Sequence, residues 1–203
     1  MFNYDDFLTR AKARLLTEPP LAWNRSDDDM NECARLIPEG IIPKPAAVLI
    51  GIVKRAEPMV ILTKRQDHMR KHAGQIAFAG GRLDAGETVL DAALREAEEE
   101  IALDRKFVTP LGYADGFLTI TQFQVVPVVA VVSPLCILEP HAGEVAEIFE
   151  VPLAFLMDGQ NCKLETRTIK NITRQFYAYT SEDRFIWGAT AGMIKNLHDR
   201  LYE

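Results

Sequence analysis

The chain is poor in cysteine, and it lacks any long uninterrupted hydrophobic run. Three cysteines, Cys33, Cys136 and Cys162, lie far apart in 203 residues and form no Cys-x-x-Cys pair. Their spacing indicates neither a disulfide framework nor a structural zinc site, and it favours a reducing compartment. No stretch reaches the roughly 20 apolar residues of a membrane-spanning helix. Charged residues interrupt the first 16 positions, which excludes the apolar core of a signal peptide. We therefore expect a cytoplasmic protein that has no membrane partner.

The chain also lacks an excess of basic residues. It carries 23 Lys and Arg against 29 Asp and Glu, which gives a formal net charge of -6. Because a negative molecule repels phosphate backbones, we expect no nucleic-acid partner. With 48% hydrophobic and 26% charged residues, the composition is typical of a folded globular chain. The oligomeric state stays open, and a homodimer is one alternative.

The spacing of apolar residues predicts both helices and strands. An amphipathic helix is expected over residues 2–16, followed by an arm rich in proline and aspartate. Two apolar runs, 46–53 and 59–63, predict a strand pair at the start of the core. Further strands are expected at 107–114, 123–132, 145–151, 163–168 and 175–180, and further helices at 88–103 and 190–201.

These elements predict two parts of unequal size. Residues 1–45 form an N-terminal helix and wrapping arm, and residues 46–203 form the main domain. The alternation of strands with helices predicts the α/β (α+β) class, with a mixed β-sheet sandwiched between helices. Thr88 and Asp91 form a variant of the capping box, which predicts where the helix over residues 88–103 begins.

That helix carries an acidic face. At about 100° per residue, Glu96, Glu99 and Glu100 fall within about 100° of one another. Like charges at these spacings cost roughly a few tenths of a kcal/mol each on an isolated helix, and a bound cation would offset this cost. Mg²⁺ and Mn²⁺ prefer oxygen ligands and would activate water against a diphosphate. The alternative is an acidic surface that only faces solvent.

Residues 81–103 resemble the Nudix box, G-x5-E-x7-R-E-U-x-E-E-x-G-U. The matching residues are Gly81, Glu87, Arg95, Glu96, Glu99, Glu100 and Leu103. The resemblance implies a Nudix-type fold and metal-dependent hydrolysis of a diphosphate with Mg²⁺ or Mn²⁺. It assigns the metal ion to Glu96, Glu99 and Glu100. It implies that Arg95 orients a glutamate and that Glu87 is an accessory acid in the preceding loop.

Two positions depart from the box. Ala97 is small for an apolar position, and Ala102 replaces the glycine near the end. Since alanine allows the helix to continue, we expect a changed helix exit at Ala102 without loss of the chemistry. All the acids of the box are present, which argues against a relative that has lost catalysis.

A basic segment precedes the box. Residues 61–81 resemble the signature of the coenzyme A pyrophosphatase branch of the Nudix family, L-L-T-x-R-S-x3-R-x3-G-x3-F-P-G-G. The matching residues are Leu62, Thr63, Arg65, Arg70, Gly74, Phe78, Gly80 and Gly81. Gln66 stands in place of the usual serine and Ala79 in place of the usual proline, which changes the stiffness expected of the loop. The alternative is a basic loop that is merely solvated.

The second resemblance implies that the substrate is coenzyme A, cleaved to adenosine 3′,5′-bisphosphate and 4′-phosphopantetheine. Guanidinium groups bind phosphate oxygens in a bidentate way, so we expect Arg65 and Arg70 to contact them. The candidate substrate-binding residues are Lys64, Arg65, Arg70, His72, Gly80 and Gly81. The alternatives are hydrolysis of other nucleoside diphosphate derivatives, such as ADP-ribose, and a non-catalytic Nudix-like module that binds a nucleotide.

The C-terminal half supplies two further hypotheses. Nudix enzymes often take a general base from outside the box, and both Glu144 and Glu147 fit that role, with no choice between them from sequence. Phe185 and Trp187 lead into the last apolar helix. For these two aromatic residues we expect packing in the core, with contact to adenine or pantetheine as the alternative.

Overall fold

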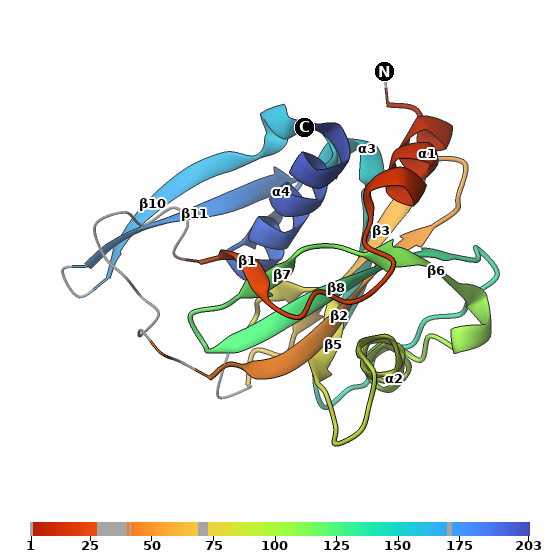
Figure 1. The fold of residues 1–203 in the computed structure, drawn as a ribbon, viewed down its shortest axis with the longest axis horizontal. Helices are drawn as coiled ribbons and strands as arrows, with labels where there is room; N and C mark the ends of the chain where they lie inside the picture. The colour runs from red at the N-terminus through yellow and green to blue at the C-terminus, as the bar shows by residue number, and fades with distance from the viewer. Residues whose placement is uncertain (1, 28–39, 41, 69–72, 170–171) are drawn as a thin grey trace.

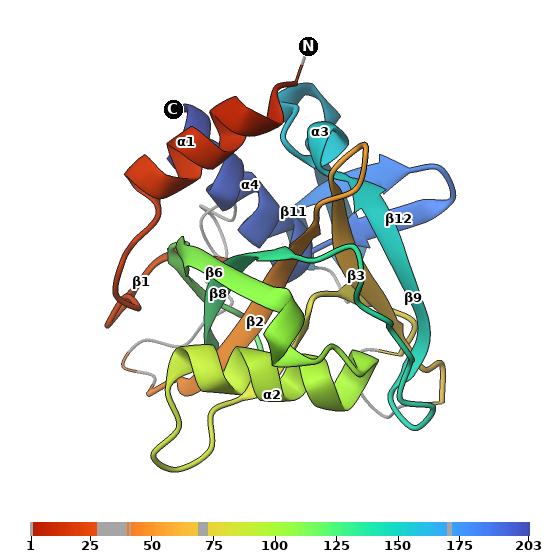
Figure 2. The ribbon, with the colours of Figure 1, turned by 90° about the vertical axis from the view of Figure 1, so that its right-hand side faces the viewer.

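A mixed β-sheet lies between two layers of helices in the computed structural model, which describes residues 2–27, 40, 42–68, 73–169 and 172–203. Helix α2 (Val89–Ile101) covers one face of the sheet. Helices α1 (Tyr4–Arg14) and α4 (Ala189–Tyr202) cover the other face (Figure 1 and Figure 2). The expected class, a mixed sheet sandwiched between helices, is confirmed.

Strand β2 (Lys44–Val53) is central to the sheet. It runs parallel to β8 (Phe123–Val132) over its whole length. Its other edge is shared, because β5 (Ala79–Arg82) pairs with its first half and β3 (Met59–Arg65) pairs with only its last two residues. Strands β2 and β8 are almost continuously apolar, since most of their residues are buried on both faces of the sheet. Strands β3 and β5 therefore diverge from one edge of β2.

The remaining strands extend the sheet on both sides. Strand β9 (Val145–Pro152) and the short β4 (Ile76–Ala77) pair with β3. Strands β6 (Val108–Tyr113) and β7 (Gly116–Leu118) share the outer edge of β8. Strand β1 (Trp23–Ser26) runs parallel to β7. Within the described residues these nine strands form one sheet.

A second, smaller sheet is formed by the C-terminal strands. In the described part of the chain its strands are β10 (Lys163–Ile169), β11 (Ile172–Ser181) and β12 (Arg184–Trp187). Helix α4 packs against β11 and β12, and the β10–β11 hairpin extends away from the body of the molecule (Figure 1). The short helical segments are α3 (Leu153–Leu156), η1 (Arg105–Phe107) and η2 (Gly159–Asn161).

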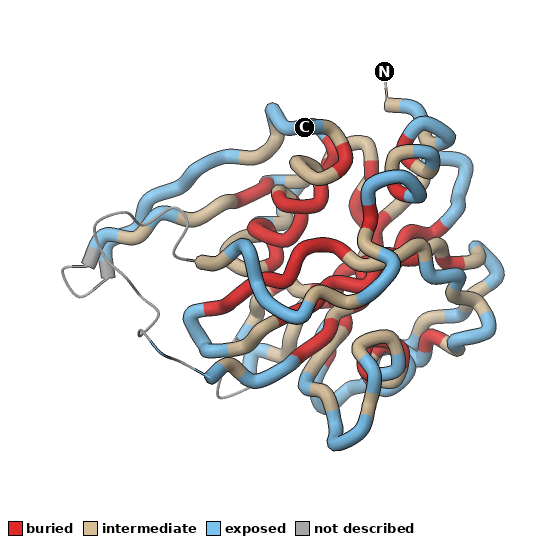
Figure 3. The backbone as a smooth tube through the Cα atoms, viewed as in Figure 1, coloured by how far each residue is buried: buried red, intermediate tan, exposed pale blue. Residues whose placement is uncertain are grey.

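Buried apolar side chains form two clusters, one on each side of the main sheet. The first includes Phe7 of α1 and Leu197 of α4, packed against the sheet residue Phe117. The second includes Ala97 of α2 and Val128 of β8. Figure 3 shows buried residues along the central strands and along α4. Ala97 is fully buried, so the small residue at this position of the box allows α2 to pack close to the sheet.

Every helix and strand that the sequence predicts is present, with shifts of a few residues at the ends. The sequence reading missed β1, β4, β5, β7, β12 and α3, which are two to four residues long. Elements this short show no periodicity of their own. Strand β1 lies within the arm expected through residue 45, whose positions 28–39 and 41 lie outside the described residues. None of the helices in the described ranges has the length and apolar composition needed to cross a membrane.

The expectation that Phe185 packs in the core is wrong. Its side chain is 45% exposed, whereas the neighbouring Ile186 is fully buried. Successive residues of a strand point to opposite faces, so Phe185 and Trp187 share the face of β12 that Ile186 does not. Trp187 is partly buried and meets Phe176 edge to face, with 5.5 Å between ring centroids.

Candidate active site

Two glycines of β5 bring the strand close to its neighbours. Gly80 and Gly81 pair with Val48 and Ala47 of β2. A Cβ atom on Gly80 would lie 2.4 Å from the carbonyl oxygen of Ala47, and one on Gly81 would lie 2.3 Å from Oε1 of Glu96. A side chain at Gly80 would clash with the backbone of β2, whereas one at Gly81 would displace the carboxylate of Glu96. Both glycines border the acidic side of α2.

Helix α2 begins at the expected cap. The side chain of Thr88 accepts a hydrogen bond from the backbone N–H of Asp91 at 3.1 Å, and its hydroxyl donates to Asp91 Oδ2 at 2.6 Å. The N-terminal cap predicted from Thr88 is thereby confirmed, although the Asp91 carboxylate returns to the Thr88 side chain. In a standard capping box it would return to the backbone.

The expectation of a changed helix exit is wrong. The helix ends at Ile101, and Ala102 takes the left-handed conformation with φ 54° and ψ 27°. This is the conformation for which helices usually select glycine, and it costs alanine about 1 to 2 kcal/mol. The N–H of Leu103 then donates to the carbonyl of Ala97 at 3.2 Å. Residue 102 therefore keeps the glycine-type exit and accepts backbone strain.

Glu100 is the most deeply buried carboxylate of the cluster. It is 5% exposed and accepts a hydrogen bond from the N–H of Gly80 at 3.2 Å. Nη1 of Arg65 lies 3.6 Å from its Oε1. Burial raises the pKa of Glu100 to about 7, with smaller contributions from the charges of Glu96 and Glu144, although Gly80 and Arg65 oppose the shift. A positive charge beside this carboxylate would therefore be favourable.

Glu96 and Glu99 are progressively more exposed along the same side of the helix. The side chain of Glu96 is 17% exposed and that of Glu99 is 58% exposed. Burial raises the pKa of Glu96 despite its bond to Arg95. The acidic face therefore runs from a buried carboxylate to one that meets solvent.

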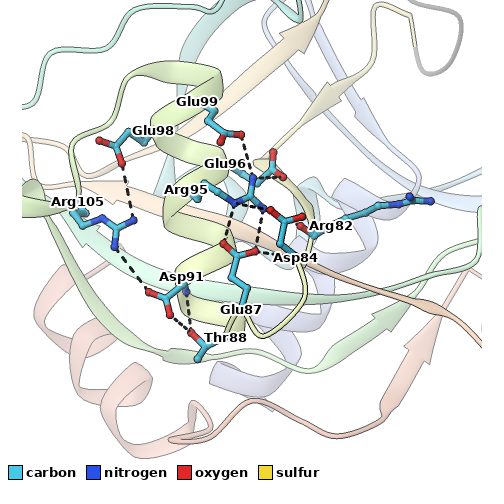
Figure 4. Close-up of polar contacts among 10 residues, drawn as sticks. All are labelled: Arg82, Asp84, Glu87, Thr88, Asp91, Arg95, Glu96, Glu98, Glu99 and Arg105. Carbon is cyan, nitrogen blue, oxygen red and sulfur yellow. Dashed lines mark hydrogen bonds and ion pairs between the residues drawn. The ribbon is translucent and has the colours of Figure 1, made fainter.

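Arg95 links the loop before α2 to the acidic face (Figure 4). Its Nε and Nη2 donate to the two carboxylate oxygens of Glu87 at 2.9 and 3.1 Å. Its Nη1 donates to Glu96 at 2.9 Å and to Glu99 at 3.1 Å, and Nη2 also donates to the carbonyl of Arg82. These hydrogen bonds lower the pKa of Glu87. Glu87 thus lies in the loop before α2 and is held there by Arg95.

The donor set of this face fits a divalent cation. Glu96, Glu99 and Glu100 offer carboxylate oxygens, the ligands that Mg²⁺ and Mn²⁺ prefer. Burial raises the pKa values of Glu96 and Glu100, so their charged forms would gain from a nearby cation. In the described residues, the one group of three potential ligands within 4.8 Å of one another is His198, Asp199 and Glu203. The three glutamates of α2 would therefore need side-chain shifts to bind one ion together.

The two glutamates considered as a base lie in different surroundings. Nη2 of Arg65 lies 3.9 Å from Oε2 of Glu144, and the charge of Glu144 contributes to the raised pKa values of Glu96 and Glu100. Glu147 instead accepts two hydrogen bonds from Arg184, each 2.6 Å long, which lower its pKa. The structure therefore brings Glu144, and not Glu147, to the acidic face.

The predicted substrate-binding residues are only partly brought together. Arg65 lies between Glu100 and Glu144, whereas Lys64 is opposite Glu147 in the β3–β9 pairing. Arg70 and His72 lie outside the described residues. Sequence reasoning missed Arg184, the partner of Glu147, because no local pattern connects residues so far apart in the chain.

Comparison with known proteins supports the sequence patterns. A family model described as the NUDIX domain matches residues 43–171, a range that contains all the carboxylates of the acidic face. An uncharacterized Nudix hydrolase named NudL, from Escherichia coli O7:K1, is 41% identical over 156 residues, which cover 76% of this chain and 81% of NudL. NudL of Shigella boydii serotype 18 is 40% identical with the same coverage.

Solved structures are more distant. A C. elegans Ap4A hydrolase binary complex has 20% identity and a TM-score of 0.47, and the match covers 54% of this chain and 80% of that chain. A Nudix hydrolase from M. smegmatis, RenU, has 24% identity and a TM-score of 0.44, with coverage of 54% and 71%. Likenesses this distant say nothing about the substrate.

Proposed function

Since this chain belongs to the Nudix hydrolase family, whose enzymes act on pyrophosphate bonds, we propose that it cleaves the diphosphate of coenzyme A or a close derivative. The products are adenosine 3′,5′-bisphosphate and 4′-phosphopantetheine. The family explains the reaction, whereas the choice of coenzyme A depends on the segment before the box.

The position of Arg65 is the observation that carries this proposal. Arg65 belongs to the segment that resembles the coenzyme A signature, and its guanidinium lies against Glu100 and Glu144. Its buried Nε has no hydrogen-bond partner among the described residues. A buried guanidinium N–H favours an acceptor, and a phosphate oxygen is a good one. Arg65 therefore connects the predicted substrate segment with the acidic face.

Enzymes of this family generally need a divalent metal ion, and in this proposal Glu96, Glu99 and Glu100 hold Mg²⁺ or Mn²⁺. When bound, the ion neutralises phosphate charge and lowers the pKa of water. The remaining contributions come from the chain itself. Arg95 holds Glu96 and Glu99 in position, and Glu87 in turn fixes the guanidinium of Arg95.

Glu144 is the proposed general base. Its half-exposed carboxylate, near Arg65, accepts a proton from the water that attacks one phosphorus. The bond between that phosphorus and the bridging oxygen breaks, and its electron pair leaves with the second phosphate. One water is consumed, and each product carries half of the diphosphate as a phosphate monoester. Glu147 is a poorer base because Arg184 occupies both of its oxygens.

Product analysis tests the proposal. The purified protein is incubated with coenzyme A, its dephospho form or ADP-ribose, each with Mg²⁺, with Mn²⁺ or with a chelator, and products are identified by mass spectrometry. Metal-dependent formation of adenosine 3′,5′-bisphosphate, faster than cleavage of the other two substrates, supports the proposal. Preferential cleavage of ADP-ribose would reject coenzyme A as the substrate but would keep the assignment of the protein as a hydrolase. Failure on all three would favour a module that only binds a nucleotide.

A further inference from the structure

Gln66 connects the end of β3 to the segment that carries Glu144. Its side-chain amide donates hydrogen bonds to the carbonyls of Ala142 at 3.1 Å and Val145 at 3.2 Å. Its backbone N–H donates to the carbonyl of Glu144 at 2.9 Å. A single residue therefore binds the main chain on both sides of Glu144 and at Glu144 itself.

The same segment is also fixed from the opposite side. The N–H of His141 donates to the carbonyl of Glu100 at 2.9 Å, which connects the segment to the end of α2. The N–H groups of Glu144 and Val145 both donate to the carbonyl of His141, so residues 141–145 form a tight turn. This turn thus lies between α2 and Gln66.

The strand pairing changes at this place. Lys64 is opposite Glu147, but the next residue, Arg65, is opposite Val145, so the register between β3 and β9 shifts by one residue. Such a bulge re-aims the side chains that follow it. Beyond the bulge, Arg65 approaches Glu144 on the acidic face, whereas Lys64 and Glu147 face each other before it.

We propose that Gln66 is a positioning residue, which holds the turn of residues 141–145 so that the Glu144 carboxylate faces the acidic side of α2. This inference rests on the proposed function, in which Glu144 is the base. The side chain of Glu144 is 49% exposed, and its ion-pair contact within the described residues is the 3.9 Å approach of Arg65. Its place is therefore set by the main chain that Gln66 binds.

The chemistry of the amide explains why glutamine suits this position. An amide NH₂ group has two donors, and each meets a different carbonyl, whereas a serine hydroxyl has one. A base displaced by about 1 Å can lose about 100-fold in rate. Loss of the two donors should therefore act on turnover more than on substrate binding.

The variant Gln66→Glu keeps the size of the side chain and removes both donors. We expect its kcat for coenzyme A with Mg²⁺ to fall about 10-fold or more, with KM changed less than about 3-fold. If coenzyme A is not cleaved, the same variants are assayed with ADP-ribose as the substrate. Gln66→Met, which is neutral and of similar length, repeats the test without a new charge. Gln160→Glu makes the same chemical change at an exposed position of η2 and should leave kcat unchanged.

A double-mutant cycle with Glu144→Gln separates positioning from general destabilisation. If Gln66 acts through Glu144, its substitution should cost about 10-fold in the parent enzyme and less than about 2-fold when Glu144 is already replaced. An equal loss in both backgrounds, or no loss in the parent, would overturn the inference. An unchanged kcat for Glu144→Gln alone would reject Glu144 as the base. A failure of the base assignment is therefore seen in the Glu144 variant, and a failure of the Gln66 inference is seen in the Gln66 variants. Melting temperatures show that each variant is folded.

Discussion

Gly81 lies directly against the carboxylate of Glu96, with room for a hydrogen atom and none for a methyl group. The variant Gly81→Ala must therefore displace Glu96, a proposed metal ligand. We expect kcat to fall about 10- to 100-fold and the Mg²⁺ concentration needed for half-maximal rate to rise. Steady-state rates across a Mg²⁺ titration measure both quantities.

Gly86→Ala is the matched control for that variant. Gly86 lies in the loop between β5 and α2, where no atom is within 4 Å of an added Cβ, but its φ of +83° strains any side chain. We expect a loss of about 1 kcal/mol in unfolding free energy and nearly normal turnover. If Gly81→Ala retained normal turnover, the contact with Glu96 would have no catalytic importance.

Glu98, Glu99 and Glu100 are consecutive but face different surroundings. Glu98 is directed toward Arg105, at 4.0 Å, and not toward the proposed metal site (Figure 4). We expect Glu99→Gln and Glu100→Gln to lower metal-dependent turnover by about 100-fold or more, because a neutral amide weakens cation binding. Glu98→Gln should stay close to the parent rate. Similar rates for all three variants, measured at saturating Mg²⁺, would remove the assignment of the ligands.

Arg95 provides a test of geometry at constant charge. Its guanidinium binds Glu87, Glu96 and the carbonyl of Arg82 at once, and lysine cannot reproduce such a fork. We expect Arg95→Lys to lower kcat about 10- to 100-fold. Arg105→Lys, on an exposed arginine whose closest carboxylate contacts are 3.9 and 4.0 Å, should have almost no effect on kcat. Full activity of Arg95→Lys would show that charge alone is sufficient.

Asp115 connects the main sheet to α4 through an ion pair that should depend on pH. Arg200 donates two hydrogen bonds to this buried carboxylate, and Asn24 donates another at 2.8 Å. Burial raises the pKa of Asp115, but these hydrogen bonds outweigh it and leave the pKa below its ordinary value. The pair therefore stabilises the fold above the unfolded-state pKa of about 3.9, and this contribution is lost as pH falls through the folded-state value.

Asp115→Asn should accordingly lower the unfolding free energy by about 3 kcal/mol at neutral pH, with a smaller difference from the parent in strong acid. Urea unfolding at several pH values measures this. Asp183→Asn changes an exposed aspartate and serves as the control. A difference that does not shrink in acid would show that ionisation of Asp115 is not its cause.

The sequence contained enough information for the acidic helix because its signals are local. Residues three and four apart share a helix face whatever the rest of the chain does, so Glu96, Glu99 and Glu100 could be grouped in advance. The apolar runs of β2 and β8 were equally clear, since burial on both faces leaves a continuous pattern.

The remaining features depend on pairing between distant segments. The place of Glu144 near Arg65, apart from Glu147, goes with a one-residue shift between β3 and β9, which neither strand encodes alone. The contact of Arg65 with Glu100 joins the end of β3 to helix α2, and the two residues are 35 positions apart in the sequence. Alanine disfavours the left-handed conformation, but at Ala102 the tertiary fold overrides this local preference.

The divided edge of β2 gives two segments of the proposed site separate attachments to the sheet. The segment that resembles the coenzyme A signature leaves the sheet at Arg65 and returns at Ile76, whereas the box begins on β5, which is paired independently with the first half of β2. Insertions or deletions between Arg65 and Ile76 would lengthen or shorten a loop and leave the Val48–Gly80 register intact. In the proposed function, a change in the length of that loop would therefore alter the segment proposed to select the substrate and leave the proposed metal ligands on α2 in place.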